Sequence, residues 1–206
     1  LWCKLQQPDQ MSSFQQASDT IYVHAEAVPV NGFNRATAPS SSSTCNEAGA
    51  REYLGGHKWP LGLQNTSINN LAKIPIRFFI CDDSGSMILS DGHKLMSTAA
   101  GVQKFVTCTR WQELTEGLKF HAGLARAASA PTEFRLLNGG PPIRIGIPDE
   151  NENARFELLM SKLEQSPSGE TPLCRHIREV TDTIRAMEGQ LRATGQKACV
   201  IIATDG

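Results

Sequence analysis

The chain has 206 residues, 40% hydrophobic and 20% charged, a composition typical of globular domains and unlike that of disordered or membrane-spanning chains. A formal net charge of -1 provides no basic footprint for nucleic acid, and no run of about 18 apolar residues predicts a membrane-spanning helix. The six cysteines contain no C-x-x-C pair, which argues against a zinc site or a disulfide framework and weakly favours a cytoplasmic protein.

Residues 1–70 form a polar segment with little periodicity, which we expect to be largely irregular. Gln and Ser are frequent at 6–18, and the sequence PSSSST at 39–44 has the composition of a flexible linker. Residues 21–30 are locally apolar and could add a strand, and Trp59 is expected to anchor the segment on the domain that follows. That domain is expected to span residues 71–206.

The first half of this domain contains a predicted strand and two predicted helices. The strand is the nearly continuous apolar run IRFFIC at 76–81, which is typical of a strand buried on both faces in a parallel sheet. Leu95, Ala99, Val102 and Val106 follow helical spacing and predict a helix within 91–109. A second helical pattern runs from about 111 to 128.

The second half begins with alternating residues on either side of a glycine turn, which predict a β-hairpin at 134–147 with its second strand at a sheet edge. A short amphipathic helix follows at 156–163. A longer one is expected to start with Thr171 as its N-cap and to end at Gly195. Residues 199–203 (CVIIA) predict a second buried strand. This order indicates an α/β fold: a mainly parallel central sheet flanked by helices, with one antiparallel edge strand, as in Rossmann-type folds.

Polar side chains follow both buried strands of the predicted sheet. The sequence DDSGS at 82–86 comes directly after the first strand, and Asp205 follows the last. Ligands of open α/β sheets bind at the carboxyl ends of the strands, so these oxygens are expected to meet. Carboxylate, hydroxyl and water oxygens suit Mg²⁺, Mn²⁺ or Ca²⁺. A turn of small polar residues that merely closes the strand is the simpler alternative.

This arrangement resembles the metal-ion-dependent adhesion site of von Willebrand factor type A domains. Asp82, Ser84 and Ser86 match the D-x-S-x-S signature, which is continued by Met87. The segment SGETPL at 168–173 is similar to the family's second loop, and ATDG at 203–206 is similar to its third. The resemblance covers roughly residues 74–206. The stretch between the first two loops is longer than usual, and the family continues beyond its third loop, so we expect a domain incomplete at its C-terminus, and a fragment of a longer protein.

The resemblance implies a function in binding. Ser84 and Ser86 would bind Mg²⁺ (or Mn²⁺ or Ca²⁺) through their hydroxyls, Asp82 and Asp205 directly or through water, and Thr171 would join as its loop moves. Two carboxylates then balance the cation while neutral hydroxyls keep it electrophilic. An open coordination position would accept an acidic side chain of a partner protein. Asp83 is expected to support the site or to face solvent.

Two other functions remain open: a metal-independent interaction module and, less favoured, a metal-dependent hydrolase. No general base stands out for hydrolysis. A phosphoaspartate phosphatase would need an aspartate at position 84, and a receiver domain would need an acceptor aspartate far earlier than 205. The chain also lacks a G-x-S-x-G elbow, a P-loop and a dinucleotide fingerprint. We therefore expect a protein that is not an enzyme.

Overall fold

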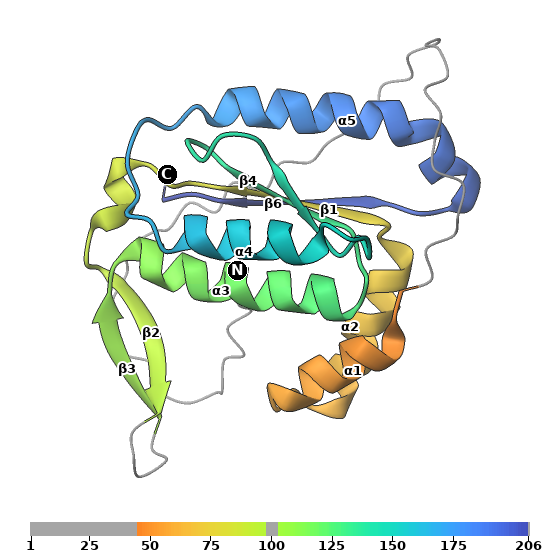
Figure 1. The fold of residues 1–206 in the computed structure, drawn as a ribbon, viewed down its shortest axis with the longest axis horizontal. Coiled ribbons are helices and arrows are strands. Elements are labelled where there is room, and N and C mark those ends of the chain that lie inside the picture. Colours follow the sequence, from red (N-terminus) through yellow and green to blue (C-terminus); the bar gives the residue numbers. More distant parts are fainter. Residues whose placement is uncertain (1–44, 98–102, 206) are drawn as a thin grey trace, which may run out of the picture. The chain divides into compact units, whose positions relative to one another are not determined.

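The computed structural model describes residues 45–97 and 103–205. The chain divides into two units, residues 1–41 and 42–206, and all described residues belong to the second. Its fold is α/β, with a mixed sheet of mostly parallel strands flanked by helices (Figure 1). The elements are α1 (Glu47–Gly56), α2 (Leu61–Lys73), β1 (Ile76–Cys81), the 3-10 helix η1 (Gly85–Ile88), β2 (Gly92–Ser97), β3 (Gln103–Cys108), α3 (Arg110–Ala127), β4 (Thr132–Leu136), β5 (Ile143–Ile145), α4 (Glu152–Leu163), α5 (Leu173–Thr194) and β6 (Ala198–Ala203).

The central sheet has four strands in the order β5-β4-β1-β6. β1 pairs in parallel with β4 and with β6, so that Phe79 lies between Phe134 and Ile201. β5 pairs antiparallel with β4 and places Ile143 opposite Phe134. The expected parallel sheet with one antiparallel edge strand is therefore confirmed. The apolar run of β1 explains the central place of this strand in the sheet. Its last four residues are all buried, because strands cover both of its edges and helices cover both of its faces.

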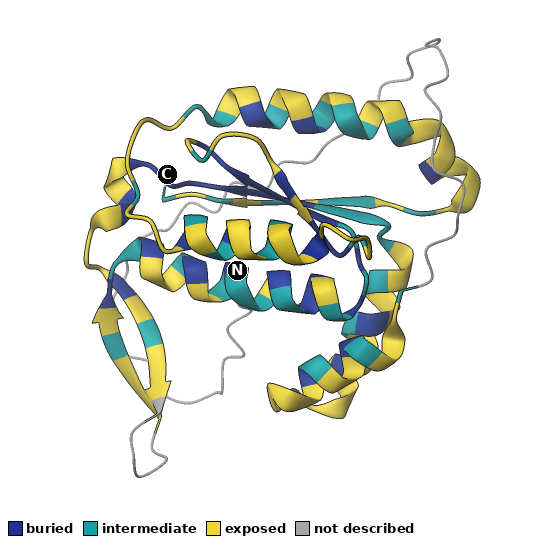
Figure 2. Cartoon of the chain, in the orientation of Figure 1, coloured by how far each residue is buried: buried dark blue, intermediate teal, exposed yellow. Residues whose placement is uncertain are grey.

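Helices cover both faces of the sheet (Figure 1). α3 and α4 lie on one face, where Leu118 and Leu159 pack with Phe79 and Phe134 in the larger core cluster. α5 lies on the other face and packs Val180 against alternate residues of β1. Figure 2 shows buried residues concentrated in β1 and β4 and on the inward sides of these helices. Within the described residues, no helix is both long and apolar enough to cross a membrane.

The prediction of a helix within 91–109 is wrong. The described part of this segment is an antiparallel ribbon of β2 and β3, with Leu95 opposite Phe105 and Lys94 opposite Val106. Apolar residues on two short paired strands reproduce helical spacing by coincidence, since Leu95 and Val106 lie on different strands. Gly92 allows the first strand to approach Thr109 closely, because a Cβ there would lie 2.8 Å from the Thr109 carbonyl oxygen. The apolar Ala99 and Val102 lie outside the described residues.

The segment expected to be irregular contains two helices in its described part. α1 buries Ala50 and Leu54 with Leu124 of α3, and the ring of Trp59 stacks on Phe120 with centroids 5.4 Å apart. The anchor predicted at Trp59 thus exists, but it belongs to a helical pair that packs on α3. Polar, weakly periodic sequence hid these helices, because tertiary packing stabilises them more than local propensity does. Residues 21–30 lie outside the described part of the chain.

Candidate metal centre

The loop at 82–88 begins where β1 ends. The Asp82 backbone N–H donates to the Ala203 carbonyl at 2.8 Å, so the carboxyl ends of β1 and β6 are joined directly above the loop. Asp82, Asp83 and Ser84 are all buried, although each carries a polar side chain. Such groups persist in a protein interior only when they have hydrogen-bond partners. The hydrogen-bond partners of these three side chains therefore determine which of their oxygens could bind a ligand.

The Asp82 carboxylate is held at both oxygens. Oδ1 accepts the Ser84 backbone N–H at 2.9 Å, and Oδ2 accepts the Thr204 hydroxyl at 2.8 Å. The Ser84 and Ser86 hydroxyls lie 3.1 Å apart. Three of the five predicted site residues are thus brought together at one strand end. Thr204 is an addition that the sequence analysis did not identify, although its place beside Asp205 at the end of β6 could have suggested it.

Asp83 and Asn138 join three loops. Asp83 Oδ1 accepts the Asn138 backbone N–H at 2.8 Å and its side-chain N–H at 3.0 Å. The same Asn138 amide donates to the Glu170 carbonyl at 2.8 Å, and the Ser168 N–H donates to the Asp83 carbonyl at 2.8 Å. Gly169 sits between them with φ +96°, a backbone conformation that glycine adopts without strain. Asp83 is therefore buried and does not face solvent, and Asn138 links the second loop to the first.

Thr171 lies in this second loop but is exposed. No hydrogen bond among the described residues joins its hydroxyl to Asp82, Ser84 or Ser86. Its predicted role as the N-cap of the following helix is wrong, because α5 begins at Leu173 with Pro172 in the capping position and no side-chain cap. The loop is nevertheless anchored against the first one, since the Gly85 N–H donates to the Gly169 carbonyl at 3.3 Å.

Asp205 is paired with a residue that the sequence analysis missed. Arg110 Nη1 lies 2.5 Å from Asp205 Oδ2, and its Nε and Nη2 bind the two oxygens of Asp91 at 2.7 and 2.6 Å. Hydrogen bonds to Asp91 and Asp205 raise the pKa of Arg110, and the hydrogen bond from Arg110 lowers the pKa of the Asp91 carboxyl. Asp205 therefore follows Thr204 at the end of β6, but its carboxylate already has a cationic partner.

No family model, no curated protein and no solved structure matches this chain significantly. The resemblance to von Willebrand factor type A domains thus depends on the three motif segments alone.

The donor chemistry of these residues suits a hard divalent cation. Carboxylate and hydroxyl oxygens are the available ligands, and the nearby thiol of Cys81 is buried with its pKa raised by desolvation. The described residues contain no cluster of three or more His, Cys, Asp or Glu side chains placed to hold a metal ion. The expected set would not form such a cluster, because it has only two carboxylates and draws its remaining ligands from hydroxyl groups.

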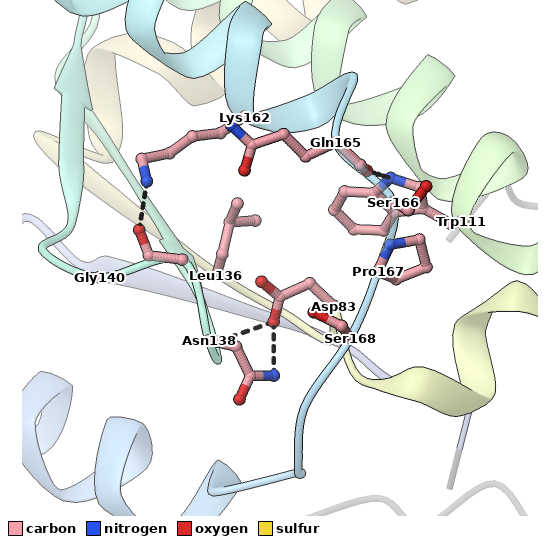
Figure 3. A pocket seen from close by; sticks show the side chains of 11 residues that line it. Asp83, Trp111, Leu136, Asn138, Gly140, Lys162, Gln165, Ser166, Pro167 and Ser168 are labelled. Carbon is pink, nitrogen blue, oxygen red and sulfur yellow. Dashed lines mark hydrogen bonds between the residues drawn. The ribbon is translucent and has the colours of Figure 1, made fainter.

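A cavity of about 310 Å³ adjoins the loop on the side of Asp83 (Figure 3). Trp111 forms part of its wall and donates its indole N–H to the Gln165 carbonyl at 2.8 Å. Lys162 donates to the Gly139 carbonyl at 2.6 Å across the opening. Figure 3 shows Asp83 and Asn138 joined where the cavity meets the loop. This cavity therefore lies directly beside the candidate centre.

Proposed function

We propose that this chain contains a von Willebrand factor A-like domain that binds a divalent cation, Mg²⁺ in the first instance, and through it an acidic side chain of a partner protein. The observation that carries the proposal is the pair of Ser84 and Ser86 hydroxyls, 3.1 Å apart, beside the buried Asp82 carboxylate. The ligand set is Asp82, Ser84, Ser86, Thr171 and Asp205. Thr171 and Asp205 would join only after local movement, because one is exposed and the other is paired with Arg110.

The chemistry of the proposed ligands supports this function, because only two of them are charged carboxylates and the others are neutral hydroxyl groups. An ionised carboxylate has about four lone-pair sites, so Asp82 can keep its bonds to Ser84 and Thr204 and still face a cation. The two carboxylates of Asp82 and Asp205 would balance the charge of Mg²⁺, and the neutral hydroxyls would leave it electrophilic. A carboxylate from a partner would then provide a further oxygen ligand. No bond is broken in this step.

The first test is calorimetric titration of the protein with Mg²⁺ and Mn²⁺. Asp82→Asn keeps the size of the side chain but removes its charge, and we expect it to abolish binding. Asp182→Asn is the control, because that carboxylate is exposed on α5 and, among the described residues, forms an ion pair with Arg185 alone. Binding that survives Asp82→Asn would refute the ligand assignment.

The second test addresses the partner. Two peptides that differ only by Asp against Asn serve as probes, and their binding is measured with Mg²⁺ and with EDTA. The proposal expects the Asp peptide to bind more tightly, and only when Mg²⁺ is present. Equal binding in EDTA would favour the metal-independent interaction module. Metal-dependent cleavage of a phosphate ester or of a peptide bond would favour a hydrolase.

A further inference from the structure

Arg110 connects the candidate metal centre to the β2–β3 ribbon. Its guanidinium binds Asp205, which follows β6, and Asp91, which precedes β2. Three of its N–H groups are used in these bonds, at 2.5 to 2.7 Å. Arginine presents its donors in a planar fork, so it can hold two carboxylates at once in a defined geometry. One side chain thus ties two segments that are far apart in sequence.

The backbone of Arg110 is fixed on both sides. Its N–H donates to the Leu89 carbonyl at 3.0 Å, immediately after η1. The preceding residue, Thr109, forms a capping box with Gln112 and so defines the start of α3. The Arg110 side chain therefore extends towards Asp205 from a well-anchored backbone.

The two ion pairs differ in burial. The side chain of Asp205 is 10% exposed, whereas that of Asp91 is 58% exposed. An exposed pair contributes little because water screens it, but a largely buried carboxylate needs a counter-charge. The counter-charge of Asp205 is Arg110 in this structure. The same carboxylate is one of the two that would balance a divalent cation.

We infer that Arg110 is a built-in competitor of the metal ion: it neutralises Asp205 until a divalent cation replaces it, and so sets the affinity of the site. This inference rests on the function proposed above. A cation bound at Asp82 and Asp205 would repel the guanidinium and take the oxygen that it holds. Arg110 would then retain only the exposed Asp91, and the base of the ribbon would lose its tie to the sheet.

The exchange couples two parts of the molecule. Because binding linkage is reciprocal, anything that draws Arg110 away from Asp205 strengthens metal binding, and metal binding loosens the ribbon. The amides of β2 and β3 should therefore exchange faster when Mg²⁺ is bound. Partner recognition at the metal would in this way alter a neighbouring surface that carries the exposed side chains of Leu95 and Phe105.

The test compares the Mg²⁺ affinity of the wild-type protein with that of Arg110→Gln by calorimetry. We expect the variant to bind about tenfold more tightly, within the usual range of coupling between sites. Arg155→Gln is a matched control, because Arg155 also bridges two carboxylates, Asp149 and Glu152, and is similarly exposed. Arg110→Lys keeps the positive charge, so its Mg²⁺ affinity should stay within about threefold of the wild-type affinity. It is the second variant to be measured if Arg110→Gln does not fold.

A second readout needs no variant. Hydrogen exchange of the amides at 92–97 and 103–108 is compared in the wild-type protein with and without Mg²⁺, and faster exchange with the metal is expected. If Mg²⁺ binds equally to the wild type and Arg110→Gln, or leaves exchange of the ribbon unchanged, the inference is overturned while the proposed function stands. If neither protein binds Mg²⁺, the proposed function fails and the inference fails with it.

Discussion

Glu133 has the most completely buried carboxylate among the described ion pairs. Its side chain is 0% exposed and binds Arg135 Nε at 2.6 Å and Arg144 Nε at 2.7 Å, while Arg135 also pairs with Glu179 of α5. The register places Glu133 beside Phe78 of β1, on the face that α5 covers. Desolvating these charges is costly, and only complete pairing makes their burial tolerable.

Removal of this carboxylate should therefore cost much more than removal of its exposed partner. We expect Glu133→Ala to lower the free energy of unfolding by about 3 kcal/mol, because Arg135 would remain buried without its buried counter-charge and would keep only the half-exposed Glu179. Arg144, 53% exposed, is the comparison, and Arg144→Ala should cost less than about 1 kcal/mol. Urea unfolding followed by circular dichroism measures both. Equal losses would show that burial does not govern this network.

The sequence supported a correct prediction of the strand β4 but not of this network. Phe134 and Leu136 alternate with polar residues, which indicated the first strand of a hairpin. In the structure Arg135 and Glu133 are buried as well, because α5 lies over the other face. Alternation identifies which residues share a face, but it cannot show that a helix more than thirty residues later will cover the polar one.

A helix, strand or loop could be predicted from the sequence where the contacts that stabilise it join residues close together in the chain. β1 and its DDSGS loop could be predicted because an apolar run and its polar turn are adjacent in sequence. The tie between Arg110 and Asp205 could not, because the two residues are 95 positions apart and neither belongs to a repeated pattern. The β2–β3 ribbon was missed because its spacing mimics a helix.

Gly49 provides a test of the packing of α1 on α3. A Cβ at this position would overlap the carbonyl oxygen of Ala127, and Asn46 beside it donates its backbone N–H to Ala128 at 2.7 Å. We expect Gly49→Ala to destabilise the domain by about 2 kcal/mol, since backbone atoms must shift to admit the methyl group.

The matched control is Gly189→Ala, which lies within α5 with no atom near its added Cβ. It should stabilise by about 1 kcal/mol through helix propensity. Thermal unfolding of the two variants beside the wild type distinguishes them. A gain in both would indicate that α1 does not pack closely on α3 in solution.

For the whole molecule, acid should weaken the fold slightly by removing two exposed ion pairs, each of which contributes little because water screens it. The pKa values of Asp91 and Asp149 are lowered by hydrogen bonds from Arg110 and Arg155. Their unfolded values are about 3.9, so their contribution is complete above that pH and is lost as the pH falls towards the folded values. The melting temperature should therefore decline below about pH 4.

The double variant Asp91→Asn/Asp149→Asn tests whether these two ion pairs cause the loss of stability in acid. It should melt at a lower temperature than the wild type at pH 7. The difference should shrink as the pH falls below about 4, because the unfolded wild-type chain then takes up protons that the folded ion pairs resist. A difference that stays constant across this range would assign the acid sensitivity to other carboxylates. Differential scanning calorimetry in matched buffers provides the measurement.

The central position of β1 also determines when the sheet can assemble. Phe79 is paired on one side with Phe134 and on the other with Ile201, residues that are made much later. During synthesis β1 therefore leaves the ribosome as an apolar segment without either neighbour, and its second ladder forms only when nearly all of the described chain has emerged. Such long-range parallel pairing slows folding and prolongs the exposure of strand edges. A chaperone that binds short extended apolar segments should therefore engage nascent chains most strongly while residues 76–81 are exposed and residues 198–203 are still inside the exit tunnel.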